Sequence, residues 1–129
     1  MEVMEMRTAK LLFLPILLLL MSCAAQHPGA VNPFDSSTYD SLLATHGIIE
    51  QTKTDLANNA IPANLVPGVK NALNLLITAY NVTDAAYQAY HAALTTGTAT
   101  STQQADVQTK LSNMTTAQNA LVSAKTGGQ

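Results

Sequence analysis

The chain of 129 residues is long enough for one small domain, and its 6 basic and 8 acidic side chains give it a net charge of −2. After residue 22 the only basic residues besides histidine are four lysines, and no run of like charges occurs. Proteins that bind nucleic acid need a basic surface that neutralises phosphates. The composition therefore excludes a nucleic-acid partner.

The most apolar part of the chain lies near its beginning, from Leu11 to Met21. Pro15 interrupts this stretch, and a helix that crosses the hydrocarbon core of a membrane needs about 18 to 20 apolar residues. A short basic region followed by an apolar stretch and small residues is typical of a secretory signal peptide. We expect residues 1–22 to be such a signal, and translation from Met6 would place two cations directly before the apolar stretch.

The four residues Leu20-Met21-Ser22-Cys23 stand where the apolar stretch ends, and they include the only cysteine of the chain. They resemble the lipobox of bacterial lipoproteins, in which a branched apolar residue and a small residue precede an obligatory cysteine. The resemblance implies diacylglycerol on the Cys23 sulfur, cleavage before Cys23, and a fatty acid such as palmitate on the new N-terminus. The alternative is ordinary signal cleavage after Ala24, with Cys23 discarded.

A lipid on Cys23 would make the membrane a partner of this protein, because more than one acyl chain gives stable anchoring. In Gram-negative lipoproteins an aspartate after the cysteine favours the inner membrane, whereas here Ala24 follows it. By this analogy we expect the protein at the outer membrane, facing the periplasm or the cell surface. Residues 23–36 hold two prolines and a glycine without an apolar period, so we expect a flexible linker there.

The body, residues 37–126, shows three amphipathic segments, and we expect helices at about 37–58, 65–95 and 101–125. The sequence Ser37-x-x-Asp40 has the form of an N-terminal cap for the first helix. Gly47 marks a point where a neighbouring helix can approach closely, and Pro62 lies in the turn that follows. The apolar stripe of the first helix would be formed by Tyr39, Leu42, Leu43, His46, Ile49 and Leu56.

The second segment has the most regular pattern, because apolar residues and one threonine alternate steps of three and four. The series is Val66, Val69, Leu73, Leu76, Tyr80, Thr83, Tyr87, Tyr90 and Leu94, and alanines recur beside it every seven residues. A seven-residue period favours left-handed supercoiled packing. The third segment begins with a capping pattern at Ser101 and Gln104, and its stripe is Val107, Leu111, Met114, Ala117, Leu121 and Ala124. Short turns favour antiparallel neighbours, so the sequence predicts an all-α, up-down-up three-helix bundle.

Catalytic and metal-binding patterns are not recognisable in this sequence. His46 and Glu50 are four residues apart on one helix, but a metal site needs at least three ligands. His91 and Asp84 are seven apart, and no HExxH or ExxH pattern accompanies them. We therefore expect solvent-exposed or edge histidines, no metal, no cofactor and no enzymatic activity.

Tyr80, Tyr87, Tyr90 and Leu94 form the candidate binding surface of the second helix. Tyrosines on one helix face can line a groove for a partner helix or an apolar ligand. The interpretation that we favour places the tyrosines in the core, opposite the alanines. Because the second helix is the longest, we expect a domain whose end near Tyr87 and Tyr90 is partly open.

These observations predict a lipid-anchored envelope protein that acts as a non-enzymatic helical binding or scaffold module. A small carrier or sensor, which binds an apolar molecule between its helices, is the alternative. We expect an envelope protein as the partner of the first, and a monomer rather than an oligomer in both.

Overall fold

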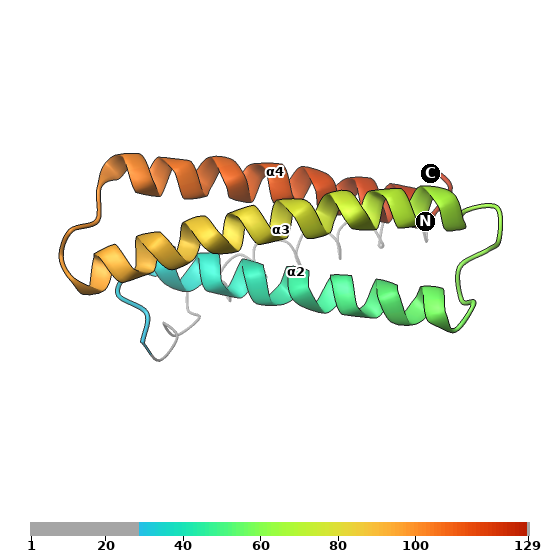
Figure 1. Ribbon diagram of the computed structural model, residues 1–129, viewed down its shortest axis with the longest axis horizontal. Coiled ribbons are helices and arrows are strands. Elements are labelled where there is room, and N and C mark those ends of the chain that lie inside the picture. The colour runs from blue at the N-terminus through green and yellow to red at the C-terminus, as the bar shows by residue number, and fades with distance from the viewer. Residues whose placement is uncertain (1–28, 129) are drawn as a thin grey trace, which may run out of the picture.

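The computed structural model describes residues 29–128, which form three helices and no strand. The helices are α2 (Pro33–Ala57), α3 (Val66–Thr95) and α4 (Ser101–Lys125). Their chain directions alternate, and the three lie side by side along most of their length (Figure 1). The predicted all-α, up-down-up bundle is therefore confirmed. The predicted signal peptide and Cys23 lie outside the described residues.

Helix α2 begins four residues earlier than predicted, within the segment that we expected to be a linker. Asn32 has extended backbone angles (φ −152°, ψ 171°), and its side-chain oxygen accepts a 2.8 Å hydrogen bond from the Asp35 N–H. Pro33 occupies the first helical position, where its fixed φ suits the helix and its missing N–H costs nothing. The cap predicted at Ser37 and Asp40 is wrong, because Asn32 and Pro33 supply a complete start one turn upstream.

All three helices end in the same way, with a residue of positive φ directly after the cap. These residues are Asn59 (φ 56°), Gly97 (φ 71°) and Gly127 (φ 72°). The next residue in each case donates a backbone hydrogen bond of 2.7 to 2.8 Å to a carbonyl five residues back. This is the Schellman arrangement, which satisfies the last carbonyls of a helix and turns the chain sharply. The start of α4 is capped by Thr100 and Gln103, one residue before the pair that we predicted.

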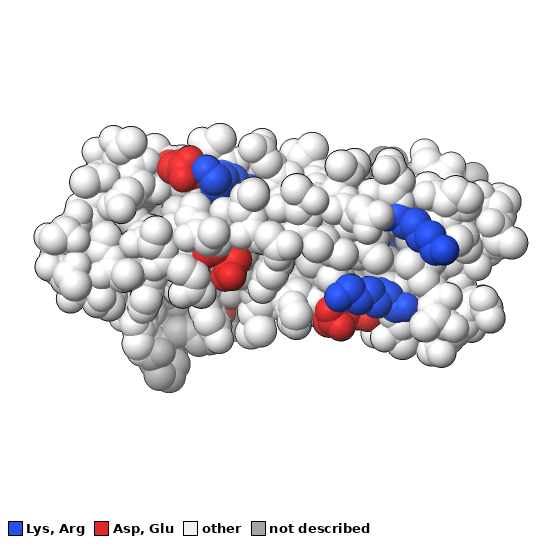
Figure 2. Space-filling view, in the orientation of Figure 1, with Lys and Arg blue, Asp and Glu red and all other residues white. Residues whose placement is uncertain are grey.

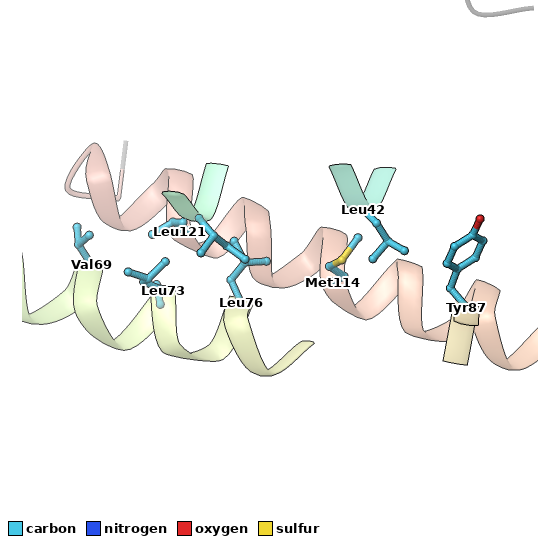
Figure 3. Close-up of a cluster of buried hydrophobic side chains, with 9 residues drawn as sticks. Leu42, Val69, Leu73, Leu76, Tyr87, Met114 and Leu121 are labelled. Atoms are coloured by element: carbon cyan, nitrogen blue, oxygen red, sulfur yellow. The ribbon is translucent and has the colours of Figure 1, made fainter. Parts of the chain in front are cut away.

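The core is formed mainly by α3 and α4, whose backbones lie closer together than those of α3 and α2. The heptad pattern predicted for α3 is confirmed at Val69, Leu73, Leu76, Thr83, Tyr87 and Tyr90, all of which are buried. Helix α4 contributes one buried residue per heptad, namely Val107, Met114 and Leu121. Figure 3 shows Val69, Leu73 and Leu76 of α3 beside Met114 and Leu121 of α4. Leu42 of α2 belongs to the same cluster.

The buried face of α2 differs from the predicted stripe because threonines replace part of the apolar set. Thr38, Thr45 and Thr52, spaced by seven residues, are at most 2 % exposed and alternate with buried Leu42 and Ile49. Each threonine hydroxyl donates to the carbonyl four residues back at 2.8 Å, which removes the cost of burying it.

Three members of the predicted α2 stripe, Tyr39, Leu43 and His46, are exposed instead of buried. The face of α2 that carries them is therefore turned out of the core. Gly47 is exposed too, and no atom lies within 4 Å of a Cβ placed on it, so no helix approaches closely there.

Candidate binding groove between the first two helices

The exposed apolar residues of α2 face a groove between α2 and α3. Its volume is about 330 Å³, which is at the small end of the range for ligand sites. Helix α2 lines it with Tyr39, Leu42, Leu43 and His46. Helix α3 lines it with Tyr80, Asp84, Tyr87 and Gln88.

Aromatic rings from both helices pair at two places along this groove. Tyr39 and Tyr87 have ring centroids 6.5 Å apart, and His46 and Tyr80 have centroids 5.9 Å apart. The partners within each helix are seven residues apart, so the two pairs are separated by about 10 Å along the helix axes. Asp84 lies on the same face of α3 between the two tyrosines, which places a carboxylate in the middle of an aromatic groove.

Tyr87 is the most deeply placed of the groove tyrosines, with 6 % of its surface exposed. Burial raises the pKa of its hydroxyl, and the nearby Asp35 carboxylate, which accepts a hydrogen bond from that hydroxyl, raises the pKa further. Tyr80 is half-buried, and its pKa is raised by burial and by the charge of Asp84. Both phenols therefore stay protonated at neutral pH and can donate hydrogen bonds.

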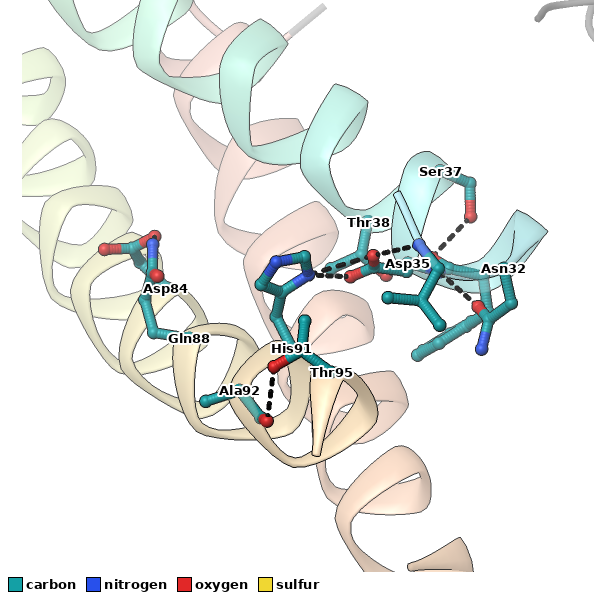
Figure 4. Close-up of polar contacts among 11 residues, drawn as sticks. Asn32, Asp35, Ser37, Thr38, Asp84, Gln88, His91, Ala92 and Thr95 are labelled. Atoms are coloured by element: carbon teal, nitrogen blue, oxygen red, sulfur yellow. Dashed lines mark hydrogen bonds and ion pairs between the residues drawn. The ribbon is translucent and has the colours of Figure 1, made fainter. Parts of the chain in front are cut away.

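Asp35 joins the first turn of α2 to the last turns of α3. Its carboxylate is fully buried, and each of its oxygens lies 2.9 Å from Nδ1 of His91 (Figure 4). The Val31 N–H also donates to Asp35, at 2.9 Å. Burial by itself raises the pKa of Asp35, but the hydrogen bonds from Val31, His91 and Tyr87 outweigh it and hold the pKa below its usual value.

The interaction of His91 with Asp35 was not predicted from the sequence. His91 is partly exposed at the edge of the bundle, as expected, but its ring turns toward Asp35 of α2 and away from Asp84. Within residues 29–128 no group of three histidine, cysteine, aspartate or glutamate side chains could hold a metal ion. The pattern Asn32-Pro33-x-Asp35 is the signal that could have revealed the buried carboxylate, because it is typical of a helix start.

The structure separates the four residues of the predicted binding surface. Tyr80 and Tyr87 line the groove, whereas Tyr90 and Leu94 do not. Tyr90 is only 2 % exposed, since Phe34 packs edge-on against it at a centroid distance of 5.6 Å. The expected opening is wrong at Tyr90, because Phe34 in the first turn of α2 covers it, whereas Tyr87 still lines the groove. The interpretation that placed these two tyrosines in the core is confirmed, because both are buried.

In comparisons with known proteins, no family model, curated protein or solved structure matches this chain. Among the described residues, no helix combines the length and the apolar character that crossing a membrane requires.

Proposed function

We propose that this protein is a lipoprotein of the bacterial envelope whose helical bundle is a non-enzymatic binding module. The observation that carries the membrane part is the sequence Leu20-Met21-Ser22-Cys23, which sets the one cysteine of the chain at the end of an apolar stretch. Residues 24–31 separate this cysteine from the cap of α2, and eight residues span at most about 28 Å. The bundle would thus be held close to the lipid surface, with the outer membrane as the preferred site.

The binding part of the proposal is supported by the groove between α2 and α3. Tyr39 and Leu43 are 43 % and 55 % exposed although neither is needed for the core. Such apolar residues, gathered in one hollow, are typical of contact sites on soluble domains. An envelope component bound on this face is the first candidate, and the volume of the groove favours a small-molecule carrier as the second.

The lipid anchor can be tested by expressing the full chain in a Gram-negative bacterium that is fed labelled palmitate. Wild type should be processed, labelled and recovered with the outer membrane. Cys23→Ser should accumulate as an unlabelled precursor, whereas Ser22→Ala, which keeps a small residue before the cysteine, should behave as wild type. Equal processing of the wild type and Cys23→Ser, without label in either, would contradict the anchor.

The binding face can be tested by chemical crosslinking in intact cells. Leu43→Asp places a charge in the groove, and Leu75→Asp is its control because Leu75 is 57 % exposed on α3 and does not line the groove. Both variants should fold, since neither residue is buried. Partners captured by the wild type and Leu75→Asp but lost from Leu43→Asp would support the groove. Capture of the same partners by all three proteins would refute it.

A further inference from the structure

The charges around the groove are unbalanced, because it contains a carboxylate and no lysine or arginine. Asp84 accepts a 3.4 Å hydrogen bond from the Gln88 amide on its own helix. Three of the four lysines in residues 29–128 are paired with Glu50, Asp106 and Asp55. The fourth, Lys70, is fourteen residues from Asp84 on the same helix, a separation of about 21 Å.

Figure 2 shows this imbalance on the molecular surface. A red patch of acidic residues is visible over the boundary between α2 and α3 without a lysine beside it, whereas the other large acidic patches on this face adjoin a lysine. An anionic ligand would meet no compensating charge from lysine or arginine in the groove and would be repelled by Asp84. A neutral apolar ligand would leave the Asp84 charge without a counter-ion beside it.

Aromatic rings add a second, independent preference for a positive charge. The face of a tyrosine ring attracts a cation that lies within about 6 Å of its centre. Tyr80 and Tyr87 flank Asp84 on α3, and Tyr39 faces Tyr87 from α2. The raised pKa values of Tyr80 and Tyr87 keep these two rings uncharged, and Leu42 and Leu43 supply apolar contact between the aromatic pairs.

We propose that the groove binds a small, free organic ammonium ion, with Asp84 as its counter-ion and the rings of Tyr39, Tyr80 and Tyr87 around its alkyl groups. The inference rests on the proposal that the groove is the binding part of this module, and it is independent of the lipid anchor. A groove of about 330 Å³ has room for a compact cation with a short apolar body. A phosphodiester next to the ammonium group, as in a lipid headgroup, would bring a negative charge toward Asp84.

The test uses the full chain, purified in a nonionic detergent, and three soluble probes. Choline is the cation, 3,3-dimethylbutan-1-ol is its neutral counterpart of the same shape, and glycerophosphocholine represents the lipid headgroup. Tyrosine fluorescence reports binding, because the chain has 4 tyrosines and no tryptophan, and three of the tyrosines line the groove. We expect saturable binding of choline, with the neutral alcohol about tenfold weaker and glycerophosphocholine weaker than choline.

Matched variants assign the binding to the groove. Asp84→Asn should weaken choline binding about three- to tenfold, whereas Asp106→Asn, an exposed acid on α4 that is paired with Lys110, should leave it unchanged. Tyr80→Phe should retain binding because the ring remains, and Tyr80→Leu should lose most of it. Thermal unfolding followed by circular dichroism verifies that each variant is folded.

Four results would overturn the inference. Equal binding of choline and the neutral alcohol would show an apolar site and leave the groove as a binding face. Glycerophosphocholine binding as tightly as choline would identify a lipid headgroup as the ligand instead of a free cation. Absence of binding by choline, or equal binding by Asp84→Asn and wild type, would remove the proposed cation site, whatever the outcome of the palmitate experiment.

Discussion

Replacing Asp35 by alanine tests how far one buried carboxylate holds α2 against α3. The change removes the acceptor of hydrogen bonds from Val31, His91 and Tyr87. A hydrogen bond to a charged group contributes about 1.5 to 3 kcal/mol, and a buried donor left alone costs about 1 to 3 kcal/mol. His91 is 32 % exposed and can regain water, so the full sum does not apply. We expect a loss of about 2 to 3 kcal/mol in the free energy of unfolding.

Urea unfolding followed by circular dichroism measures this loss, and a cycle with His91→Ala isolates the interaction of the pair. For a domain of this size each kcal/mol corresponds to about 4 to 8 °C in Tm. An Asp35→Ala protein whose stability lies within about 0.5 kcal/mol of the wild type, the ordinary range for surface substitutions, would refute the role assigned to the carboxylate.

Acidification provides an independent check of the same carboxylate. The pKa of Asp35 is lower in the folded chain than its ordinary value, so its charged form stabilises the fold. This contribution is present above pH about 4 and is lost as the pH falls through the folded pKa. The stability difference between wild type and Asp35→Ala should therefore shrink on acidification below pH about 4. A difference that stays constant there would contradict the assignment.

Three further substitutions test the packing. Leu76→Asp should abolish the cooperative helical melt seen by circular dichroism, because Leu76 is fully buried and an unpaired charge there costs several kcal/mol; an unchanged melt would show that this face is not packed. Thr52→Val should change the free energy of unfolding in urea by less than about 1 kcal/mol, since the hydroxyl bonds only within its own helix, and a larger loss would reveal a partner across the bundle. Tyr90→Ala should lower the free energy of unfolding by about 3 to 5 kcal/mol, and Tyr90→Phe by less than about 1 kcal/mol. An unchanged stability of Tyr90→Ala would show that Tyr90 is not packed in the core.

The helices themselves could be predicted because α3 repeats its apolar residues without a break and α4 buries one residue in each heptad. Their ends followed from local signals, chiefly Asn59 and Gly97, which allow a positive φ. The buried face of α2 could not be predicted from hydrophobicity. Thr45 and Thr52 count as polar in any such pattern, yet their hydroxyls bond within the helix and can be buried.

For the same reason, only the α3 side of the candidate groove could be predicted from the sequence. With threonines in the core, Tyr39 and Leu43 are left outside it and line the groove, where Tyr39 faces Tyr87 of α3. The burial of Tyr90 depends on Phe34, which belongs to the first turn of α2 and was expected in the linker. Contacts between residues 56 positions apart, such as Asp35 and His91, leave no periodic trace in the chain.

The mass of the intact mature protein, extracted from membranes with detergent, tests the central claim most directly. A lipoprotein would give a chain that begins at Cys23 and carries the added mass of a diacylglyceryl group and an N-terminal acyl chain. Fragmentation should place the whole addition on Cys23. A mature chain that begins at Ala25 and carries no lipid would contradict the proposed anchor.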